Sequence, residues 1–208
     1  MRSGSSSAML AAVPTVVTIL LVSAVGYLVG SVPIANLVAA RRRAGDLRTV
    51  GDRNPGYWNA KEQLGARSAL PVFVGDVAKG AVAAGLGAVV AAEGDWWLAY
   101  VGGGAAMVGH AWPVFAGFRG GRSVLTFVGT ALVVGPVAAV IGVAALLAVW
   151  MTTRSFAWAA RVGIVVYPIA QLVVDGPVRT ATTGALMTFI GVRFAQAALA
   201  SPAEATPG

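Results

Sequence analysis

The segment Arg48-Thr-Val-Gly-Asp-Arg-Asn-Pro-Gly-Tyr-Trp-Asn59 is polar and lies between two long apolar stretches. Its centre, Asn54-Pro55-Gly56, is typical of a tight turn, because proline fixes φ at one position and glycine allows a positive φ at the next. Such a turn can point successive backbone N–H groups at one anion, and Arg48 and Arg53 add positive charge beside it. The alternative interpretation is an ordinary solvated loop between two membrane helices.

The composition is that of an integral membrane protein. Of the 208 residues, 57% are hydrophobic and only 11% are charged, and the mean hydropathy is +0.77. A soluble domain carries about 25% charged residues. A net charge of +7 would suggest a nucleic-acid partner for a soluble protein, but the placement of the charges described below argues against one. The absence of cysteine excludes disulfides, thiolate metal sites and cysteine nucleophiles.

Seven apolar segments predict an all-α, polytopic fold with about seven transmembrane helices. They are residues 9–29, 68–92, 96–115, 124–134, 137–153, 156–174 and 180–199. The fourth is too short for a hydrocarbon core of about 30 Å, so we expect it to borrow flanking residues, to tilt or to be buried in protein. Gly26-Tyr-Leu-Val-Gly30 predicts close helix packing. Residues 1–200 are expected to form one transmembrane domain, and residues 201–208 a disordered tail.

The basic residues predict the orientation of the bundle. If residues 41–67 are cytoplasmic, eleven basic residues lie on that side and only Arg2 and Arg179 on the other. The eleven are Arg41, Arg42, Arg43, Arg48, Arg53, Lys61, Arg67, Arg119, Arg122, Arg154 and Arg193. Because cytoplasmic loops of membrane proteins are enriched in lysine and arginine, we expect the N-terminus outside and the C-terminus in the cytoplasm.

Two ionisable residues fall inside the second apolar segment. Asp76 and Lys79 are three residues apart and would share one helix face, where they can neutralise one another. Charged groups inside a span are costly, which favours a functional role over a simple internal ion pair. Gly80 would allow close approach of another backbone. His110, the only histidine, is expected to be a structural hydrogen-bonding group.

The sequence contains no Ser–His–Asp order, no paired carboxylates and no metal-ligand cluster, so we assign no catalytic nucleophile or base, no metal and no cofactor. Four polar segments, at 30–33, 51–59, 79–80 and 120–123, lie at cytoplasmic helix ends. Glycine amides, helix N-termini and basic side chains are the groups that bind phosphate. The sequence therefore predicts a phosphorylated substrate at the cytoplasmic membrane surface.

Six spaced motifs carry a resemblance to a known family. They are Gly30-Ser31-x-Pro33, Asp46-Leu-Arg48, Gly51-x-x-Asn54-Pro55-Gly56-x-x-Asn59, Asp76-x-x-Lys79-Gly80, Gly109-His110-x-x-Pro113-Val-Phe115 and Phe118-x-Gly120-Gly121-Arg122, followed by Thr153-Arg154. In this order they resemble the bacterial acyl-phosphate:glycerol-3-phosphate acyltransferases, which are seven-helix proteins of the inner membrane. The resemblance implies transfer of a fatty acyl group from acyl phosphate to glycerol 3-phosphate, forming lysophosphatidic acid for phospholipid synthesis.

The resemblance also implies a set of substrate and phosphate-binding residues. They are Ser31, Arg48, Asn54, Gly56, Asn59, Lys79, Gly80, His110, Gly120, Gly121, Arg122, Thr126 and Arg154. The expected partners are acyl phosphate, glycerol 3-phosphate or a related acceptor, and membrane lipid, but no nucleic acid. The expected reaction needs no protein nucleophile: glycine amides, Lys79 and Arg122 hold the leaving phosphate, and a substrate phosphate takes the proton.

The chain departs from the family pattern at several positions. In the family's Gly-Ser-Gly-Asn-Pro-Gly-Ala-Thr-Asn loop, Asp52, Arg53, Tyr57 and Trp58 replace Ser, Gly, Ala and Thr. In Gly-Gly-Lys-Gly, Arg122 and Ser123 replace Lys and Gly. Ala157 and Ala160 replace serines, and Phe194 and Ala197 replace a histidine and an asparagine near the C-terminus.

These departures leave two alternatives beside the family reaction. One is a paralogue with a different acyl acceptor, in which Tyr57 and Trp58 reshape the pocket. The other is a non-catalytic protein that binds lipid or phosphate. A transport role based on Asp76, Lys79 and Arg161 is weaker, because the sequence shows no inverted repeat.

Overall fold

The computed structural model describes the backbone of residues 4–92 and 94–200, and the side chains within these ranges from Val16 onward. The tail predicted at residues 201–208 lies outside the described residues. Within them every regular element is a helix, as predicted. In chain order these are α1 (Gly4–Gly30), α2 (Ile34–Arg41), α3 (Tyr57–Leu64), α4 (Ala66–Val90), α5 (Trp97–Ala111), the 3-10 turn η1 (Val114–Ala116), α6 (Val124–Val134), α7 (Pro136–Thr153), α8 (Phe156–Asp175) and α9 (Pro177–Ala200).

The predicted membrane helices correspond to α1 and α4–α9, with one clear error. The third was expected to continue to Phe115, but α5 ends at Ala111. The reason is Pro113, which has no N–H to donate and disfavours a helical conformation at Trp112. Trp112 accordingly has φ −132° and ψ 70°, and η1 follows. The short helices α2 and α3 were not predicted.

Glycines allow α1 to pack closely against α5. A Cβ atom on Gly26 would meet the carbonyl oxygen of Gly102, and one on Gly30 would meet the backbone of Ala106. The close packing predicted from the Gly26–Gly30 spacing is therefore confirmed. After Gly30 the chain bends, because Pro33 interrupts the helical hydrogen bonding before α2 begins at Ile34.

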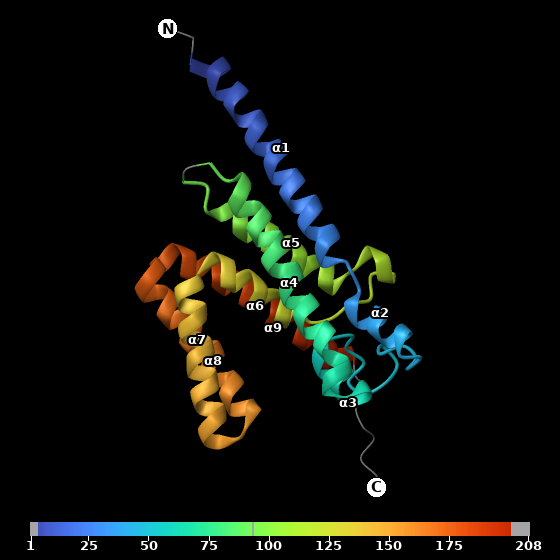
Figure 1. Cartoon of the computed structure of the whole chain (residues 1–208). Helices are drawn as coiled ribbons and strands as arrows, with labels where there is room; N and C mark the ends of the chain where they lie inside the picture. Colours follow the sequence, from blue (N-terminus) through green and yellow to red (C-terminus); the bar gives the residue numbers. More distant parts are fainter. Residues whose placement is uncertain (1–3, 93, 201–208) are drawn as a thin grey trace.

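Helices α7 and α8 form a hairpin that stands apart from α1 (Figure 1). Its tip is the turn at Arg154, which ends α7 in the left-handed conformation. The two helices meet closely where Gly142 faces Gly163. At the tip, the ring of Phe156 stacks on Trp58 of α3 with 5.5 Å between ring centroids. This stack connects the tip of the hairpin to the polar segment that precedes α4.

The fold is that of an all-helical polytopic membrane protein. Within the described residues, five helical stretches are long and apolar enough to cross a membrane, namely α4, α7, α8, α9 and Val16–Arg41, which includes the second half of α1; α6 is a shorter apolar helix. The start of α1 and the end of α4 lie toward one end, while α2 and α3 lie toward the other (Figure 1). Seven crossings and their direction remain a prediction.

Cysteine labelling tests this orientation. A single cysteine replacing Asp95, in the turn before α5, is expected to react with a membrane-impermeant reagent added to intact cells. A cysteine replacing Thr49 is expected to react only after lysis, since eleven basic residues lie on its side of the membrane. The reversed labelling pattern would invert the orientation.

Candidate functional site

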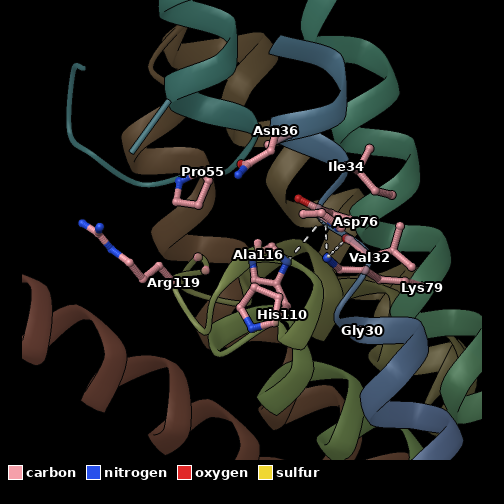
Figure 2. Close-up of a pocket in the computed structure, with 15 residues that line it drawn as sticks. Gly30, Val32, Ile34, Asn36, Pro55, Asp76, Lys79, His110, Ala116 and Arg119 are labelled. Atoms are coloured by element: carbon pink, nitrogen blue, oxygen red, sulfur yellow. Dashed lines mark hydrogen bonds and ion pairs between the residues drawn. The ribbon is translucent and has the colours of Figure 1, made fainter. Parts of the chain in front are cut away.

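Three ionisable side chains from two helices meet at one buried point. On α4, the Nζ atom of Lys79 lies 2.8 Å from Oδ1 of Asp76. On α5, Nδ1 of His110 lies 3.5 Å from the same oxygen. None of these side chains is more than 8% exposed, so the carboxylate and the ammonium compensate each other away from water (Figure 2). The ion pair expected from their spacing is confirmed.

This cluster lines a small inner cavity. The remaining lining residues come from the bend after α1, from α2 and from two loops: Gly30, Val32, Pro33, Ile34, Ala35, Asn36, Pro55, Pro113, Ala116, Arg119, Gly120 and Gly121. The free volume is only about 20 Å³, which accommodates about one water molecule. Among the described side chains there is no cluster of three or more histidine, cysteine or acidic residues that could hold a metal ion.

A larger outer groove adjoins the inner cavity. It encloses about 530 Å³ and is lined by Pro33, Asn36, Leu37, Arg48, Phe115, Ala116, Gly117 and Arg119. Four residues, Pro33, Asn36, Ala116 and Arg119, line both spaces. The groove is within the range of about 300–1,000 Å³ that small-molecule sites occupy. Its lining combines the apolar side chains of Leu37 and Phe115 with two arginines.

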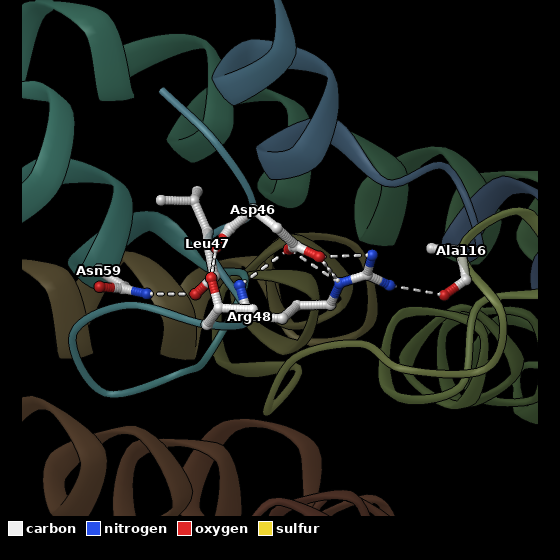
Figure 3. A network of polar contacts seen from close by, with 6 residues as sticks. Asp46, Leu47, Arg48, Asn59 and Ala116 are labelled. Carbon is white, nitrogen blue, oxygen red and sulfur yellow. Dashed lines mark hydrogen bonds and ion pairs between the residues drawn. The ribbon is translucent and has the colours of Figure 1, made fainter. Parts of the chain in front are cut away.

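Arg48 is fixed at the edge of the outer groove. Its guanidinium lies 2.7 Å from the carboxylate of Asp46 and donates a hydrogen bond of 2.9 Å to the carbonyl oxygen of Ala116 (Figure 3). The hydrogen bond from Arg48 lowers the pKa of Asp46, and the same bond raises the pKa of Arg48. The stabilisation from this pair is thus present at neutral pH and is lost as the pH falls through the lowered pKa of Asp46.

Five of the predicted site residues line these two spaces. Lys79, His110, Gly120 and Gly121 line the inner cavity, and Arg48 lines the outer groove. Sequence reasoning missed Asp76 as a partner of His110, because no carboxylate is near His110 in the chain. It also missed Asn36 and Arg119. The only sequence signal for Arg119 was its position in the basic loop at 118–123.

The two glycines do not offer free amides. The N–H of Gly120 donates to the carbonyl oxygen of Ala111 at 3.2 Å, and that of Gly121 donates to His110 at 3.0 Å. They therefore satisfy carbonyls at the C-terminal end of α5, which otherwise lack partners. A role for these amides in holding the leaving phosphate remains a prediction.

Other predicted residues are engaged in the scaffold. Asn59 is fully buried and donates to the carbonyl oxygens of Leu47 and Val50, which closes the polar loop on itself. Ser31 is buried and donates to Tyr27. A ligand contact by either side chain remains a prediction.

Gly80 and Thr126 are in direct contact at the interface of α4 with α6. A Cβ atom on Gly80 would collide with the backbone of Thr126, whose own side chain is fully buried. The close backbone approach expected at Gly80 is therefore made by α6. Ligand contacts by Gly80 and Thr126 remain predictions.

The last four predicted residues lie outside the lining of both spaces. Arg122 is bonded to Asp52, and Asn54 has its side-chain oxygen next to Gly121. Gly56 precedes the first turn of α3, and Arg154 is at the tip of the α7–α8 hairpin. Their binding roles are likewise not tested by the geometry.

Two positions where the family pattern has glycine adopt a left-handed backbone here. Arg53 has φ 57° and Ser123 has φ 63°. A positive φ is less favourable for serine than for glycine, yet Ser123 adopts one. Its hydroxyl donates a 2.7 Å hydrogen bond to the carbonyl oxygen of Met107, and the residue is 1% exposed. This buried bond offsets the strain of the positive φ.

Tyr57 and Trp58 line neither the inner cavity nor the outer groove. The Tyr57 ring packs edge-on against Phe73 of α4, with centroids 5.3 Å apart. Trp58 stacks on Phe156, and the ammonium of Lys61 lies 4.8 Å from its ring centroid. Both rings therefore join helices.

Restoring the family's small residues tests this role. The double change Tyr57→Ala and Trp58→Thr is expected to lower thermal stability in detergent, because each lost aromatic pair contributes about 0.5–1.5 kcal/mol beyond its area. The ratio of kcat/KM for glycerol 3-phosphate to that for other polyol phosphates should stay unchanged, also with Asp52→Ser added. A shift of this ratio toward glycerol 3-phosphate would support the altered-acceptor hypothesis instead.

Comparison with known proteins agrees with this geometry. Residues 20–199 match the sequence family described as glycerol-3-phosphate acyltransferase. The glycerol-3-phosphate acyltransferase of Rhizobium etli strain CFN 42 is 34% identical over 166 residues, covering 80% of this chain and 79% of that one. Crystal structures of PlsY, an integral membrane glycerol 3-phosphate acyltransferase, superpose with TM-scores of 0.74 in the glycerol 3-phosphate form and 0.71 in the lysophosphatidic acid form. Identity is 26% and 25%, over 86% of this chain and 88% of that chain.

Proposed function

This chain belongs to the glycerol-3-phosphate acyltransferase family, and we propose that its acyl transfer takes place where the inner cavity opens into the outer groove. The enzyme acylates glycerol 3-phosphate to form lysophosphatidic acid. One observation carries the location: Lys79 and Arg119 both line the inner cavity, and Arg119 also lines the groove. One cation inside the cavity and one at its junction with the groove suit a reaction in which phosphate groups bind and leave.

Acyl phosphate is the proposed donor, as the family resemblance implies. Its acyl carbon is already activated, so no protein nucleophile is needed. A hydroxyl oxygen of glycerol 3-phosphate attacks the acyl carbon, the bond from that carbon to the phosphate oxygen breaks, and inorganic phosphate leaves. The hydroxyl proton passes to a phosphate oxygen of the substrate. Lys79 and Arg119 stabilise the negative charge that grows on the leaving phosphate.

His110 is better suited to positioning than to proton transfer. Its Nδ1 faces Asp76, and its Nε2 occupies the space where a Cβ atom on Gly121 would lie. Both ring nitrogens are directed at protein groups, so the imidazole packs between α5 and the 120–123 loop. The proposed acceptor of the proton is therefore the substrate phosphate.

The proposed location is the bacterial inner membrane, with the outer groove open to the cytoplasm. The basic residues around the groove support this, since they match the cytoplasmic side of the positive-inside pattern. The apolar side chains of Leu37 and Phe115 give the groove an apolar portion beside its arginines. The inner cavity holds only about one water molecule, so binding of a phosphate group there requires the 113–121 loop or α2 to move.

The direct test uses purified protein with acyl phosphate and glycerol 3-phosphate, following both phosphate release and lipid product. Phosphate release that depends on glycerol 3-phosphate supports the proposal, and Arg119→Gln should raise KM. Acyl coenzyme A in place of acyl phosphate should give no product. Release with another polyol acceptor alone would favour the altered-acceptor alternative, and no turnover with any acceptor would favour the non-catalytic one.

A further inference from the structure

An ion pair joins the two polar loops beside the inner cavity. Oδ2 of Asp52 lies 2.9 Å from Nη1 of Arg122. The other carboxylate oxygen, Oδ1, accepts a 3.1 Å hydrogen bond from the backbone N–H of Asn54. Both oxygens are thus held, although Asp52 is 34% and Arg122 21% exposed. The pair is fixed in place and accessible to solutes.

Arg122 lies in a group of cationic and aromatic side chains. Its guanidinium carbon is 4.8 Å from the ring centroid of Phe194, and its Nε is buried with no hydrogen-bond partner among the described residues. Arg193 donates to the carbonyl oxygen of Gly121 at 3.4 Å, and its Nε is also buried without a partner. Asp52 is thus the carboxylate in direct contact with Arg122, and within the described residues the buried Nε atoms of Arg122 and Arg193 are both unused donors.

The two loops joined by this pair form part of the cavity wall. Pro55 lines the inner cavity three residues after Asp52, and Gly121 lines it directly before Arg122. The side-chain oxygen of Asn54 lies beside Gly121. The ion pair is therefore next to the place where a substrate phosphate would bind, but Arg122 is turned toward Asp52 and is absent from the lining.

We propose that Asp52 sets the affinity for the phosphate-bearing substrate: its carboxylate is an internal anion that occupies Arg122, so that a substrate phosphate must compete with it for this guanidinium. The inference rests on the proposed acyl-transfer site. Asp52 and Arg122 both replace the residues of the family pattern, and they contact each other, so their charges compensate. Like-charge repulsion between Asp52 and a bound phosphate is reduced in the same way.

The test is Asp52→Asn, which keeps the shape and removes the charge. Freeing Arg122 should lower KM for the phosphate-bearing substrate about three- to tenfold with little change in kcat, the size expected for the net gain of one hydrogen bond. KM should also rise more steeply with ionic strength, because the free guanidinium is screened by salt. Asp52→Glu retains the pair and should leave KM close to that of the wild type. An unchanged or higher KM with a lower kcat in Asp52→Asn would overturn the proposal, because the ion pair would then only stabilise the two loops.

Glu62→Gln is the matched control, since Glu62 is an exposed acidic residue on α3 of the same polar segment. Glu62→Gln should leave KM unchanged. If it lowered KM as much as Asp52→Asn does, the effect would come from the general surface charge and the proposal would fail. In the background of Arg122→Gln, adding Asp52→Asn should have no further effect on KM. A persisting decrease there would overturn the proposal, because Asp52 would then act without Arg122.

Two further measurements identify which substrate phosphate competes with Asp52 and separate this proposal from that of the acyl-transfer site. KM is measured for glycerol 3-phosphate and for acyl phosphate in turn, each with the other saturating, and the substrate whose KM falls is the competitor. Calorimetry with inorganic phosphate on the same variants needs no turnover. Tighter phosphate binding by Asp52→Asn would support the role of Asp52 even if the acyl-transfer assay failed, and unchanged binding together with unchanged KM would overturn it.

Discussion

Replacement of Lys79 by methionine is expected to abolish measurable acyl transfer and to destabilise the protein strongly. The ammonium group of Lys79 lies 2.8 Å from Asp76, and both side chains are at most 5% exposed. Removing one partner of a buried ion pair leaves an uncompensated charge and typically costs about 3–5 kcal/mol. Thermal unfolding in detergent, together with turnover of acyl phosphate, measures the two effects.

The double change Asp76→Asn and Lys79→Met separates charge balance from substrate binding. It removes both charges, so most of the stability should return, since neutral replacements of a buried pair are often tolerated. Turnover should stay absent if Lys79 contacts a phosphate group. A double variant that regains full activity would show that Lys79 only neutralises Asp76.

Local sequence patterns were sufficient to predict the long apolar helices. Apolar length identifies a span regardless of what it packs against, and the predicted segment 124–134 coincides with α6. The error at the end of α5 and the omission of α2 and α3 have a common cause. These elements lie at a proline or in a mixed, charged segment, where periodicity carries little information and tertiary contacts decide.

The site was only partly predictable for a related reason. Asp76 and Lys79 could be paired because they are one helical turn apart. The contacts of Asp76 with His110, and of Asp52 with Arg122, join segments far apart in the chain. Asp76 and His110 lie on α4 and α5, which approach closely at Gly87 and Gly102, whereas Asp52 and Arg122 lie on two loops. The pattern of a single sequence does not predict such long-range side-chain contacts.

Gly80 illustrates the difference between recognising a contact and naming its partner. The sequence indicated that another backbone would approach this glycine, but not which one. The carbonyl oxygen of Thr126 on α6 occupies this position, and Gly129 on α6 faces the backbone of Val77. The two helices are therefore held at short distance on both sides of the contact.

Gly80→Ala is accordingly expected to force α4 and α6 apart and to displace the neighbouring Lys79. The added Cβ would collide with backbone atoms of Thr126, which cannot rotate away as a side chain would. Overpacking of this kind costs about 1–3 kcal/mol. Thermal unfolding in detergent should show the loss, and turnover should fall further than stability alone explains because Lys79 moves.

Gly85→Ala is the matched control on the same helix. Nothing lies within 4 Å of the position that its Cβ would take, and an alanine in a helix interior is favoured over glycine by about 0.5–1 kcal/mol. This variant should be as stable as the wild type or more so, with unchanged turnover. Helix propensity alone would raise the stability of both variants. The packing argument instead requires Gly80→Ala to lower stability and Gly85→Ala to keep or raise it. Equal effects of Gly80→Ala and Gly85→Ala would therefore refute the tight contact between α4 and α6.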